Sequence, residues 1–331
     1  LDFDQIKNNL KQFLRNQSEF VDYDFEGSGM AVLLDLLAYN THYLGFNANM
    51  AANESFLDSA ELRSSVVSLA KMLGYTPSSP ISPTAIIDVT LTNATGPSVT
   101  MPAGTKFTST LDGDSYTYVT NSDLSITPID GIYTFPNVNI YEGTRVTFEY
   151  TISSTNEEQR YVVPNNNVDI TTLSVLVQNS VSDTSSFTYT KASSQVGVTS
   201  TSKVYFCQEV EDGKFEIYFG DGVTGFKPSD GNIIKLTYIV TNKSASNGAN
   251  TFTPSGTISG FSSTIKTISK SSGGTNAETI ASVKLNAPLQ FSAQDRAVTA
   301  ADYKVLVKKI YPAASAIQVW GGEDNDVPAY G

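Results

Sequence analysis

Residues 273–320 read GGTNAETIASVKLNAPLQFSAQDRAVTAADYKVLVKKIYPAASAIQVW, and this stretch decides the fold class because helical and strand patterns follow one another within it. A glycine pair leads into the first pattern. Thr275 or Asn276 can cap a helix there, and Ile280, Val283 and Leu285 are its apolar positions. The stretch therefore begins with a predicted helix.

A second helix follows in the same stretch. Thr299 is placed to cap it, and Asp302 stands three residues on, in capping-box position. The apolar stripe consists of Tyr303, Leu306, Val307 and Ile310, and the helix is expected to end near Pro312. AIQVW at 316–320 then alternates as a strand. Residues 273–331 thus predict a small α/β unit of helix, helix and strand, whose sheet needs residues beyond Gly331.

Residues 1–76 are helical by pattern. Phe3, Ile6, Leu10, Phe13 and Leu14 recur at three-to-four spacing and form one apolar stripe. A second pattern begins near Ser28 and carries Met30, Leu33, Leu34, Leu37 and Leu44, while Val32, Leu36 and Tyr39 add apolar surface on other faces. A helix that is apolar on several faces must be covered on more than one side.

The third predicted helix starts near Ser55, where Asp58 stands in the capping-box position. It runs through Leu62, Val66, Leu69 and Leu73 and ends at Gly74, a residue suited to the left-handed end of a helix. Prolines at 77, 80 and 83 forbid further helix and mark the end of the helical segment.

From residue 84 to about 261 the sequence is rich in Thr, Val, Ile, Tyr and Phe, and Gly, Pro, Asn and Asp interrupt it about every ten residues. The stretches AIIDVTLTN, TKFTST, SYTYVT, RVTFEYTI, RYVVP, LSVLVQ, SFTYTKA, KVYFCQEV, KFEIYFG and IIKLTYIV each read as a strand. This spacing predicts antiparallel, β-sandwich-like modules, divided near 193–202 into a β-rich domain at 84–200 and another at 201–268.

The second of these domains contains FEIYFGDGVTGFKPSDGNIIKLTYIV at 215–240, two strands around a glycine-dense connection. It is interpreted as a tight hairpin, with Gly220, Asp221, Gly222, Gly225 and Gly231 as its structural turn. SKSSGG at 269–274 reads as a flexible link to the last unit. The predicted fold class is therefore α+β and multidomain, with an N-terminal helical bundle segment, central β modules and the C-terminal unit.

Composition narrows the function classes. The chain has 331 residues, 40% of them hydrophobic, and a formal net charge of −12, so it can fill real cores but offers no basic footprint for direct nucleic-acid binding. No apolar run is long enough to predict membrane insertion, and the first residues do not resemble a signal peptide. The single cysteine, Cys207, is expected in a strand as a small apolar residue, and it cannot form an intrachain disulfide.

Residues for catalysis or metal binding are sparse. His42 is the one histidine and reads as a satisfied structural residue, and one His with one Cys cannot hold zinc. Asp112-Gly113-Asp114 and Gly220-Asp221-Gly222 could bind calcium but read better as turns. The acidic residues Glu209, Glu211 and Asp212 read as a solvated turn. We therefore expect no cofactor, no metal and no enzymatic activity.

The order of motifs in 273–320 resembles the Baseplate J-like family of contractile-tail proteins. DYDFEGS, LLAYNTHY, ESFLDSAELRSSVV, GYTP and VWGGEDN, taken together in order, resemble a narrower group, the baseplate wedge proteins of T-even-type myophages. The glycine-dense connection at 215–240 is similar to a feature that the family uses as architecture. The likeness covers roughly 1–80 and 204–331 and is thin over 84–200, which reads as a variable decoration.

The resemblance implies a structural role in the virion, in the tail baseplate, with assembly in the host cytoplasm. The implied partners are a second copy of the chain and a related wedge subunit, joined through helical bundles, in wedges that close into a sixfold ring around the hub. A sheath-initiating protein and other baseplate proteins are further partners, and the ring widens during sheath contraction and genome ejection.

The residues expected to carry this role lie in two regions. Partner-interface candidates are Phe13, Met30, Leu33, Leu37, Leu44, Phe56, Val66 and Leu69. In the C-terminal unit, Arg296, Thr299, Asp302 and Tyr303 form a second candidate contact region, although Arg296 can instead pair with Asp295 or cap a loop.

Three alternatives remain at this point. Residues 1–76 could be a self-contained helical domain with an ordinary core. The chain could be a receptor- or glycan-binding tail adhesin, for which an aromatic content of 11% is suitable, although no stalk repeat is visible. A polysaccharide-cleaving tail enzyme would need two close carboxylates, whose separation sequence does not give.

Overall fold

The computed structural model describes residues 2–17, 19, 28–155, 159–192, 196–311, 314 and 316–322. The chain divides into two compact units, residues 1–69 and 70–331. Helical and antiparallel strand-rich parts follow one another, so the α+β multidomain class is confirmed. Part of the motif DYDFEGS (22–27), the expected helix stop at Pro312 and the residues from Glu323 onward lie outside the described ranges.

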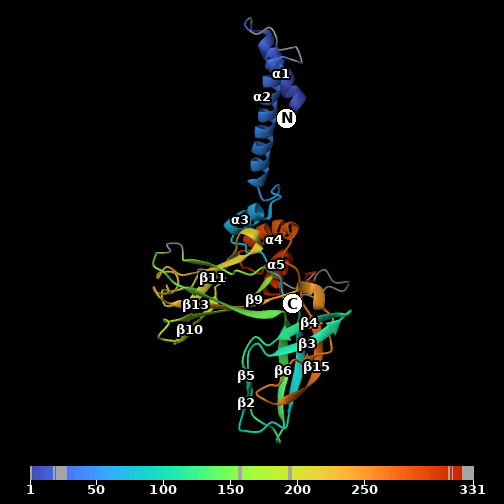
Figure 1. Cartoon of the computed structure of the whole chain (residues 1–331), viewed down its shortest axis with the longest axis vertical. Helices are drawn as coiled ribbons and strands as arrows, with labels where there is room; N and C mark the ends of the chain where they lie inside the picture. Colours follow the sequence, from blue (N-terminus) through green and yellow to red (C-terminus); the bar gives the residue numbers. More distant parts are fainter. Residues whose placement is uncertain are drawn as a thin grey trace. The chain divides into compact units, whose positions relative to one another are not determined.

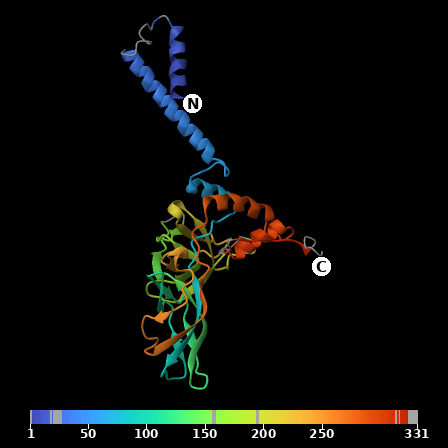
Figure 2. The same ribbon diagram turned by 90° about the vertical axis from the view of Figure 1, so that its right-hand side faces the viewer.

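The first unit consists of α1 (Phe3–Arg15), α2 (Gly29–Glu54) and the start of α3 (Arg63–Met72). Figures 1 and 2 show α1 lying beside the N-terminal half of α2. The predicted start near Ser28 agrees with the structure, in which the Ser28 side chain caps α2 by accepting a hydrogen bond from the backbone N–H of Ala31 at 3.0 Å.

The expected start of the third helix at Ser55 is wrong. Ser55 is the residue that ends α2, and α3 begins at Arg63. Glu54 provides a reason, because its carboxylate accepts hydrogen bonds from the backbone N–H groups of Glu61 and Leu62 at 2.9 and 3.3 Å, just before α3. The predicted end is confirmed: Gly74 has φ 73°, and the Tyr75 N–H donates to the Ala70 carbonyl in a Schellman arrangement.

The second unit contains a six-stranded antiparallel sheet. Its strand order is β14 (Thr253–Pro254), β3 (Lys106–Leu111), β4 (Asp114–Val119), β6 (Tyr133–Glu142), β1 (Thr84–Thr92) and β15 (Ser262–Ser272). A small sheet of β2 (Val99–Met101) and β5 (Leu124–Ile126) lies beside it (Figure 1). The fully buried core side chains include Ile87, Phe107, Tyr118, Phe135 and Ile140.

The other large sheet has seven strands in the order β7 (Thr144–Thr151), β13 (Ile233–Val240), β9 (Val168–Gln178), β10 (Ser186–Lys191), β11 (Val204–Glu209), β12 (Phe215–Phe219) and β8 (Arg160–Val162). All its pairs are antiparallel except β10 with β11. The sheet curls toward closure, because the Tyr150 hydroxyl on β7 donates to the Val162 carbonyl on β8 at 2.6 Å.

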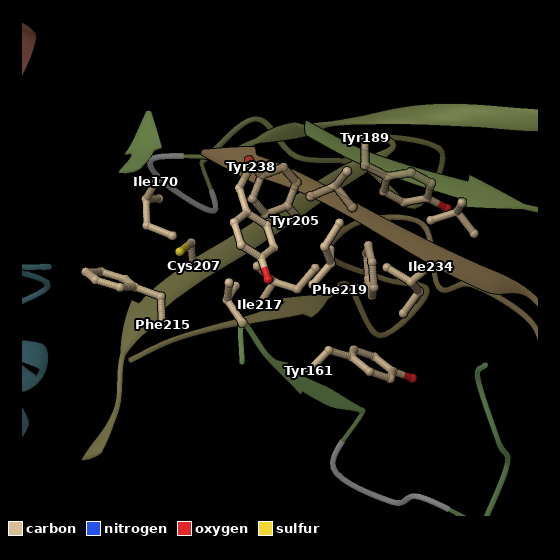
Figure 3. Packing of buried hydrophobic residues seen from close by; sticks show 14 of the residues in the cluster. Tyr161, Ile170, Tyr189, Tyr205, Cys207, Phe215, Ile217, Phe219, Ile234 and Tyr238 are labelled. Carbon is tan, nitrogen blue, oxygen red and sulfur yellow. The ribbon is translucent and has the colours of Figure 1, made fainter. Parts of the chain in front are cut away.

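The interior of this curled sheet is aromatic. Figure 3 shows Tyr161, Tyr189, Tyr205, Phe219 and Tyr238 converging on one cluster from different strands. The Tyr189 and Phe219 rings meet edge to face with centroids 5.1 Å apart. Burial raises the pKa of the Tyr189 hydroxyl to about 12. Packing of these aromatic side chains therefore stabilises the seven-stranded sheet from its interior.

The expected division at residue 200 does not separate two sheets. Strands from 84–142 and 253–272 build the six-stranded sheet, whereas strands from 144–240 build the seven-stranded one. Residue 200 lies between β10 and β11, which pair with each other. Local amino-acid composition indicates where many of the strands lie. Which strands share a sheet depends on partners that are distant along the chain.

Two connections also differ from expectation. The interpretation of 215–240 as a hairpin is wrong, because β12 pairs with β11 and β8, whereas β13 pairs with β7 and β9. The expected flexible link at 269–274 is instead ordered: its serines end β15, and buried Ser271 accepts a hydrogen bond from the Tyr118 hydroxyl at 2.8 Å.

A buried carboxylate joins the two large sheets. Glu142, at the end of β6, is 0% exposed and accepts hydrogen bonds from the Thr241 hydroxyl at 2.8 Å, the Asn242 N–H at 2.9 Å and the Asn242 side-chain amide at 2.7 Å. Gly143 follows, and a Cβ there would lie 2.3 Å from the Val240 carbonyl oxygen. The chain thus passes from the six-stranded sheet into the seven-stranded sheet after β6 and leaves the seven-stranded sheet again after β13. These two crossing points pack closely against each other.

The C-terminal part of the second unit contains α4 (Ile280–Ala293) and α5 (Ala300–Ile310), near the seven-stranded sheet (Figure 2). Thr279, not Thr275 or Asn276, caps α4, because Thr275 is paired through its backbone with Ile81. The expected strand at 316–320 is not formed among the described residues, since none of their sheets supplies a partner for it. The 3₁₀ turns Glu211–Gly213 and Lys243–Ser246 complete the described elements.

Candidate assembly interface

One face of α2 is covered within the first unit. Ala31, Leu34 and Ala38 are buried, as is Ile6 on α1, and the Lys7 ammonium lies 2.5 Å from the Asp35 carboxylate. The two short alanine side chains allow α1 to approach closely. This contact uses only one stripe of a 26-residue helix.

A second stripe of α2 is exposed, and we call it the first open seam. It consists of Met30, Leu33, Leu37 and Leu44, at spacings of three, four and seven residues. Leu33 and Leu37 are each 52% exposed, Leu44 is also exposed, and Met30 is partly buried. These were predicted interface residues, and the structure places all four on one helix at coiled-coil spacing.

A third stripe was only partly recognised in the sequence, and we call it the second open seam. Its side chains range from 43% exposed at Met50 to 64% at Val32. The members are Val32, Leu36, Tyr39, Tyr43, Phe46 and Met50, whose spacings alternate between four and three residues. That alternation was readable in the sequence and could have identified Tyr43, Phe46 and Met50 as well.

The open seams are too apolar to be an ordinary surface. Complete burial of one Leu, Val or Phe side chain stabilises by about 1.5–3 kcal/mol, and the two seams together hold several such residues. Contiguous exposed apolar patches of this kind mark interaction sites in soluble proteins. The arrangement suits binding of further helices along α2.

The remaining predicted interface residues divide into two groups. Phe13 on α1 and Phe56 after α2 are exposed, as an interface requires. Val66 is 1% exposed and Leu69 is partly buried, so these two residues do not belong to an open surface. The spacing of apolar residues correctly predicted that both residues lie on a helix. Spacing alone does not show which of these residues are buried.

The glycine-dense connection after β12 forms a compact loop. Asp221 Oδ1 accepts hydrogen bonds from the backbone N–H groups of Thr224 at 2.7 Å and Val223 at 2.9 Å, which lower the pKa of its carboxyl group. A Cβ on Gly220 would lie 2.3 Å from the Thr224 carbonyl oxygen, so only glycine fits. Gly222, Gly225 and Gly231 all have positive φ, which agrees with their prediction as turn residues.

The C-terminal candidate residues form a helix cap. Thr299 and Asp302 make the predicted capping box, and the Thr299 N–H donates to the Asp302 carboxylate at 2.8 Å. This bond is the main reason that the pKa of Asp302 lies below its ordinary value, and the charge of Arg296 adds to the effect. Asp295 pairs with Lys309, not with Arg296, and Tyr303 is exposed on α5.

The structure also places the residues that were considered for catalysis or metal binding. His42 Nδ1 has no hydrogen-bond partner among the described residues, and the expectation of a satisfied structural histidine stays a prediction. Asp112 and Gly113 form the predicted two-residue turn between β3 and β4, both with positive φ. The described residues contain no group of three His, Cys, Asp or Glu side chains arranged for a metal ion. No described helix has the length and apolarity needed to cross a membrane.

Cys207 lies in β11 and is buried, as predicted. Burial raises the pKa of its thiol from 9.0 to about 11, although the nearby charge of Lys191 opposes this. We expect the native thiol to react with Ellman's reagent about 100-fold more slowly than the urea-unfolded chain at about pH 8, because two pKa units reduce the thiolate fraction by that factor.

The same shift makes stability depend on pH. Below the unfolded pKa of 9.0 the thiol is neutral in both states, and between there and about 11 the unfolded chain ionises first. The folded state then binds more protons, so its stability should fall as pH rises through this interval. A Cys207→Ser variant should lack both this thiol contribution and the Ellman signal, and equal reaction rates in native and unfolded protein would contradict the burial.

Three models of protein families match this chain, one in its helical N-terminal part, one in its strand-rich part and one near its C-terminus. The family "Baseplate wedge protein gp6-like, helical domain" matches residues 2–75, "Bacteriophage baseplate wedge protein gp6, third domain" matches 146–250, and "Baseplate structural protein gp6, C-terminal domain I" matches 299–331. The third-domain match coincides closely with the seven-stranded sheet. The matched class is therefore that of phage baseplate wedge proteins.

The particular family follows from a curated relative. Baseplate wedge protein gp6 of Enterobacteria phage T4 is 31% identical over 358 aligned positions, which cover 99% of this chain and 52% of that protein. The chain belongs to the gp6-like family of baseplate wedge proteins, and it spans about half the length of this relative.

A solved structure is also similar in part. The cryo-EM structure of the anti-feeding prophage baseplate contains a chain that aligns with 93% of this chain and 56% of its own length, at 16% identity and a TM-score of 0.30. That TM-score is too low to establish a shared fold.

Proposed function

We propose that this chain is a structural component of a phage tail baseplate wedge, in which α2 forms the core of a bundle with helices from other subunits. The single observation that carries the proposal is the pair of open seams on α2. The remaining apolar stripe of this helix, with Ala31, Leu34 and Ala38, is already buried. A helix with three apolar stripes is stable only when each stripe is covered.

Two open seams require two further helices. The proposed partners are a second copy of this chain and a related wedge subunit, each supplying one helix. The second open seam holds two tyrosines, Tyr39 and Tyr43, whose rings stack with centroids 6.4 Å apart, whereas the first is mainly leucine. The two seams therefore present different surfaces, which suits two different partners.

Family membership supports a proposal for the larger assembly. In the proposal, wedges close into a sixfold ring around the central hub of the tail baseplate, and the chain contacts the sheath-initiating protein and other baseplate proteins. It is assembled in the host cytoplasm and remains in the virion, where its role is to support sheath attachment and contraction and not to catalyse a reaction.

The first experiment is light scattering of the purified full-length protein, alone and mixed with the products of neighbouring tail genes. We expect a stable heteromer that contains two copies of this chain. A monomer or homotrimer that ignores those partners would contradict the proposal and favour the adhesin class.

Charge placed in the seams should prevent this assembly. We expect Leu33→Asp with Leu37→Asp to abolish heteromer formation, because burial of an unpaired carboxylate costs several kcal/mol. Leu36→Asp with Tyr43→Asp should do the same through the second open seam. The far-UV circular dichroism of the strands should remain as in the wild type.

The matched control is Asn49→Asp with Asn53→Asp, which adds the same charge at the same four-residue spacing on exposed positions outside both seams. This control should assemble as the wild type does. Intact heteromers in both seam variants would refute the bundle.

A further inference from the structure

A cleft of about 450 Å³ lies in the second unit, where the seven-stranded sheet meets α4 and α5. Phe206 on β11 and Tyr218 on β12 lie opposite each other in the sheet and are among its lining residues. The Phe206 and Tyr218 rings are stacked, with centroids 5.2 Å apart and planes 21° from parallel. The volume and the aromatic lining are typical of a site that takes an apolar side chain.

The rim of this cleft is positive, although the chain as a whole has a net charge of −12. Lys71, Lys191, Lys308 and Lys309 line it, and no Asp or Glu is among its described lining residues. Lys309 pairs with Asp295, and the Lys308 ammonium donates to the Ala314 carbonyl. Lys71 and Lys191 form no ion pair with any described residue.

A buried carboxylate lies next to the lining of the cleft and offsets only part of this positive charge. Glu278 is 9% exposed, and its oxygens accept hydrogen bonds from the hydroxyls of Tyr75 and Ser282 and the side-chain amide of Asn286. These neutral donors do not remove the charge of Glu278, but the four lysines of the lining outnumber the two carboxylates of Glu278 and Asp295. Two exposed ammonium groups beside an aromatic lining attract an anion more strongly than they would on an open surface.

We propose that this cleft docks an acidic peptide segment of a partner protein, with an aromatic or aliphatic side chain against Phe206 and Tyr218 and carboxylates near Lys71 and Lys191. Charge complementarity favours this occupant, because an otherwise acidic chain concentrates positive charge at one apolar hollow. A single-stranded nucleic acid is disfavoured, since four lysines can neutralise few phosphates and the chain as a whole has a net charge of −12. No residue of α2 lines this cleft, so the proposal does not depend on the bundle.

The test uses fluorescence anisotropy with three probes at about 0.1 M salt, where the Debye length is about 10 Å. The first is a short fluorescein-labelled peptide that alternates Asp with Phe and Leu, the second replaces each Asp with Lys, and the third is an oligodeoxythymidine. The protein variants are Lys71→Glu with Lys191→Glu, and the control Lys266→Glu with Lys270→Glu, which makes the same charge change on exposed positions of β15.

We expect the acidic peptide to bind the wild type, and the Lys71 and Lys191 variant to bind it at least about tenfold more weakly. The control should stay within about twofold of the wild type, because screening limits distant charges. The proposal is overturned by no binding of the acidic peptide, by equal losses in the two variants, by equal binding of the Lys peptide, or by tighter binding of oligodeoxythymidine. Seam variants of α2 should bind the acidic peptide normally, which separates this test from that of the bundle.

Discussion

Replacing Glu142 with alanine is expected to lower the free energy of unfolding of the second unit by about 3 kcal/mol. The carboxylate is fully buried, and its removal leaves the Thr241 hydroxyl and both nitrogen donors of Asn242 without their acceptor. Each orphaned buried donor costs about 1–3 kcal/mol, partly recovered if water enters. Urea unfolding followed by circular dichroism measures the loss.

Two variants make this result specific. Glu142→Gln keeps one acceptor oxygen, so it should lose less than Glu142→Ala. Glu149→Ala removes an exposed carboxylate that lies 3.1 Å from the Lys235 ammonium, and it should change stability by less than about 0.5 kcal/mol. If Glu142→Ala and Glu149→Ala unfold at the same urea concentration, the junction does not depend on Glu142.

The Gly143→Ala variant should be destabilised by about 3 kcal/mol or more. Its new Cβ would lie 2.3 Å from the Val240 carbonyl oxygen and 2.8 Å from Ile239 Cγ2, so the backbone of β13 would have to move. The residue also has φ 126°, a conformation that side chains rarely adopt. Thermal unfolding of the two proteins side by side gives the difference.

Gly113→Ala is the matched control, because it measures the cost of a side chain at positive φ without crowding. Gly113 also has positive φ, at 95°, but no atom lies within 4 Å of the position that a Cβ would take there, on the β3–β4 turn. We expect this variant to lose only about 1 kcal/mol, from conformation alone. Equal losses in the two variants would show that crowding at Gly143 contributes nothing.

The sequence was sufficient where local chemistry decides the structure. The Thr299–Asp302 pair caps its helix as predicted, the second helix begins next to Ser28 as expected, and β-branched runs such as 85–92 and 233–240 form strands. Five strands were missed, namely β2, β5, β6, β14 and β15, and two of them, β6 and β15, have local reasons. β6 contains Pro136 and a left-handed Asn137, and β15 alternates Ser, Thr and Lys with only a few apolar residues.

The sequence failed where distant partners decide. Two strands on either side of a glycine-rich connection look like a hairpin, but β12 and β13 each find better neighbours elsewhere in the sheet. Glu54, seven residues before the N–H it binds at Glu61, moved a helix start that local capping rules placed at Ser55. For the candidate interface, spacing identified the apolar residues, whereas burial of Val66 required the folded chain.

The junction at Glu142 and Gly143 has a consequence for how such a chain can change over time. The seven-stranded sheet lies within one continuous stretch, and its first and last strands are paired, with Thr144 opposite Val240. The chain therefore enters and leaves this sheet at adjoining points, while the six-stranded sheet is completed by strands on both sides of the stretch. A module attached in this way can be exchanged, enlarged or deleted through a short bridge between its neighbouring ends, and the host sheet keeps its architecture.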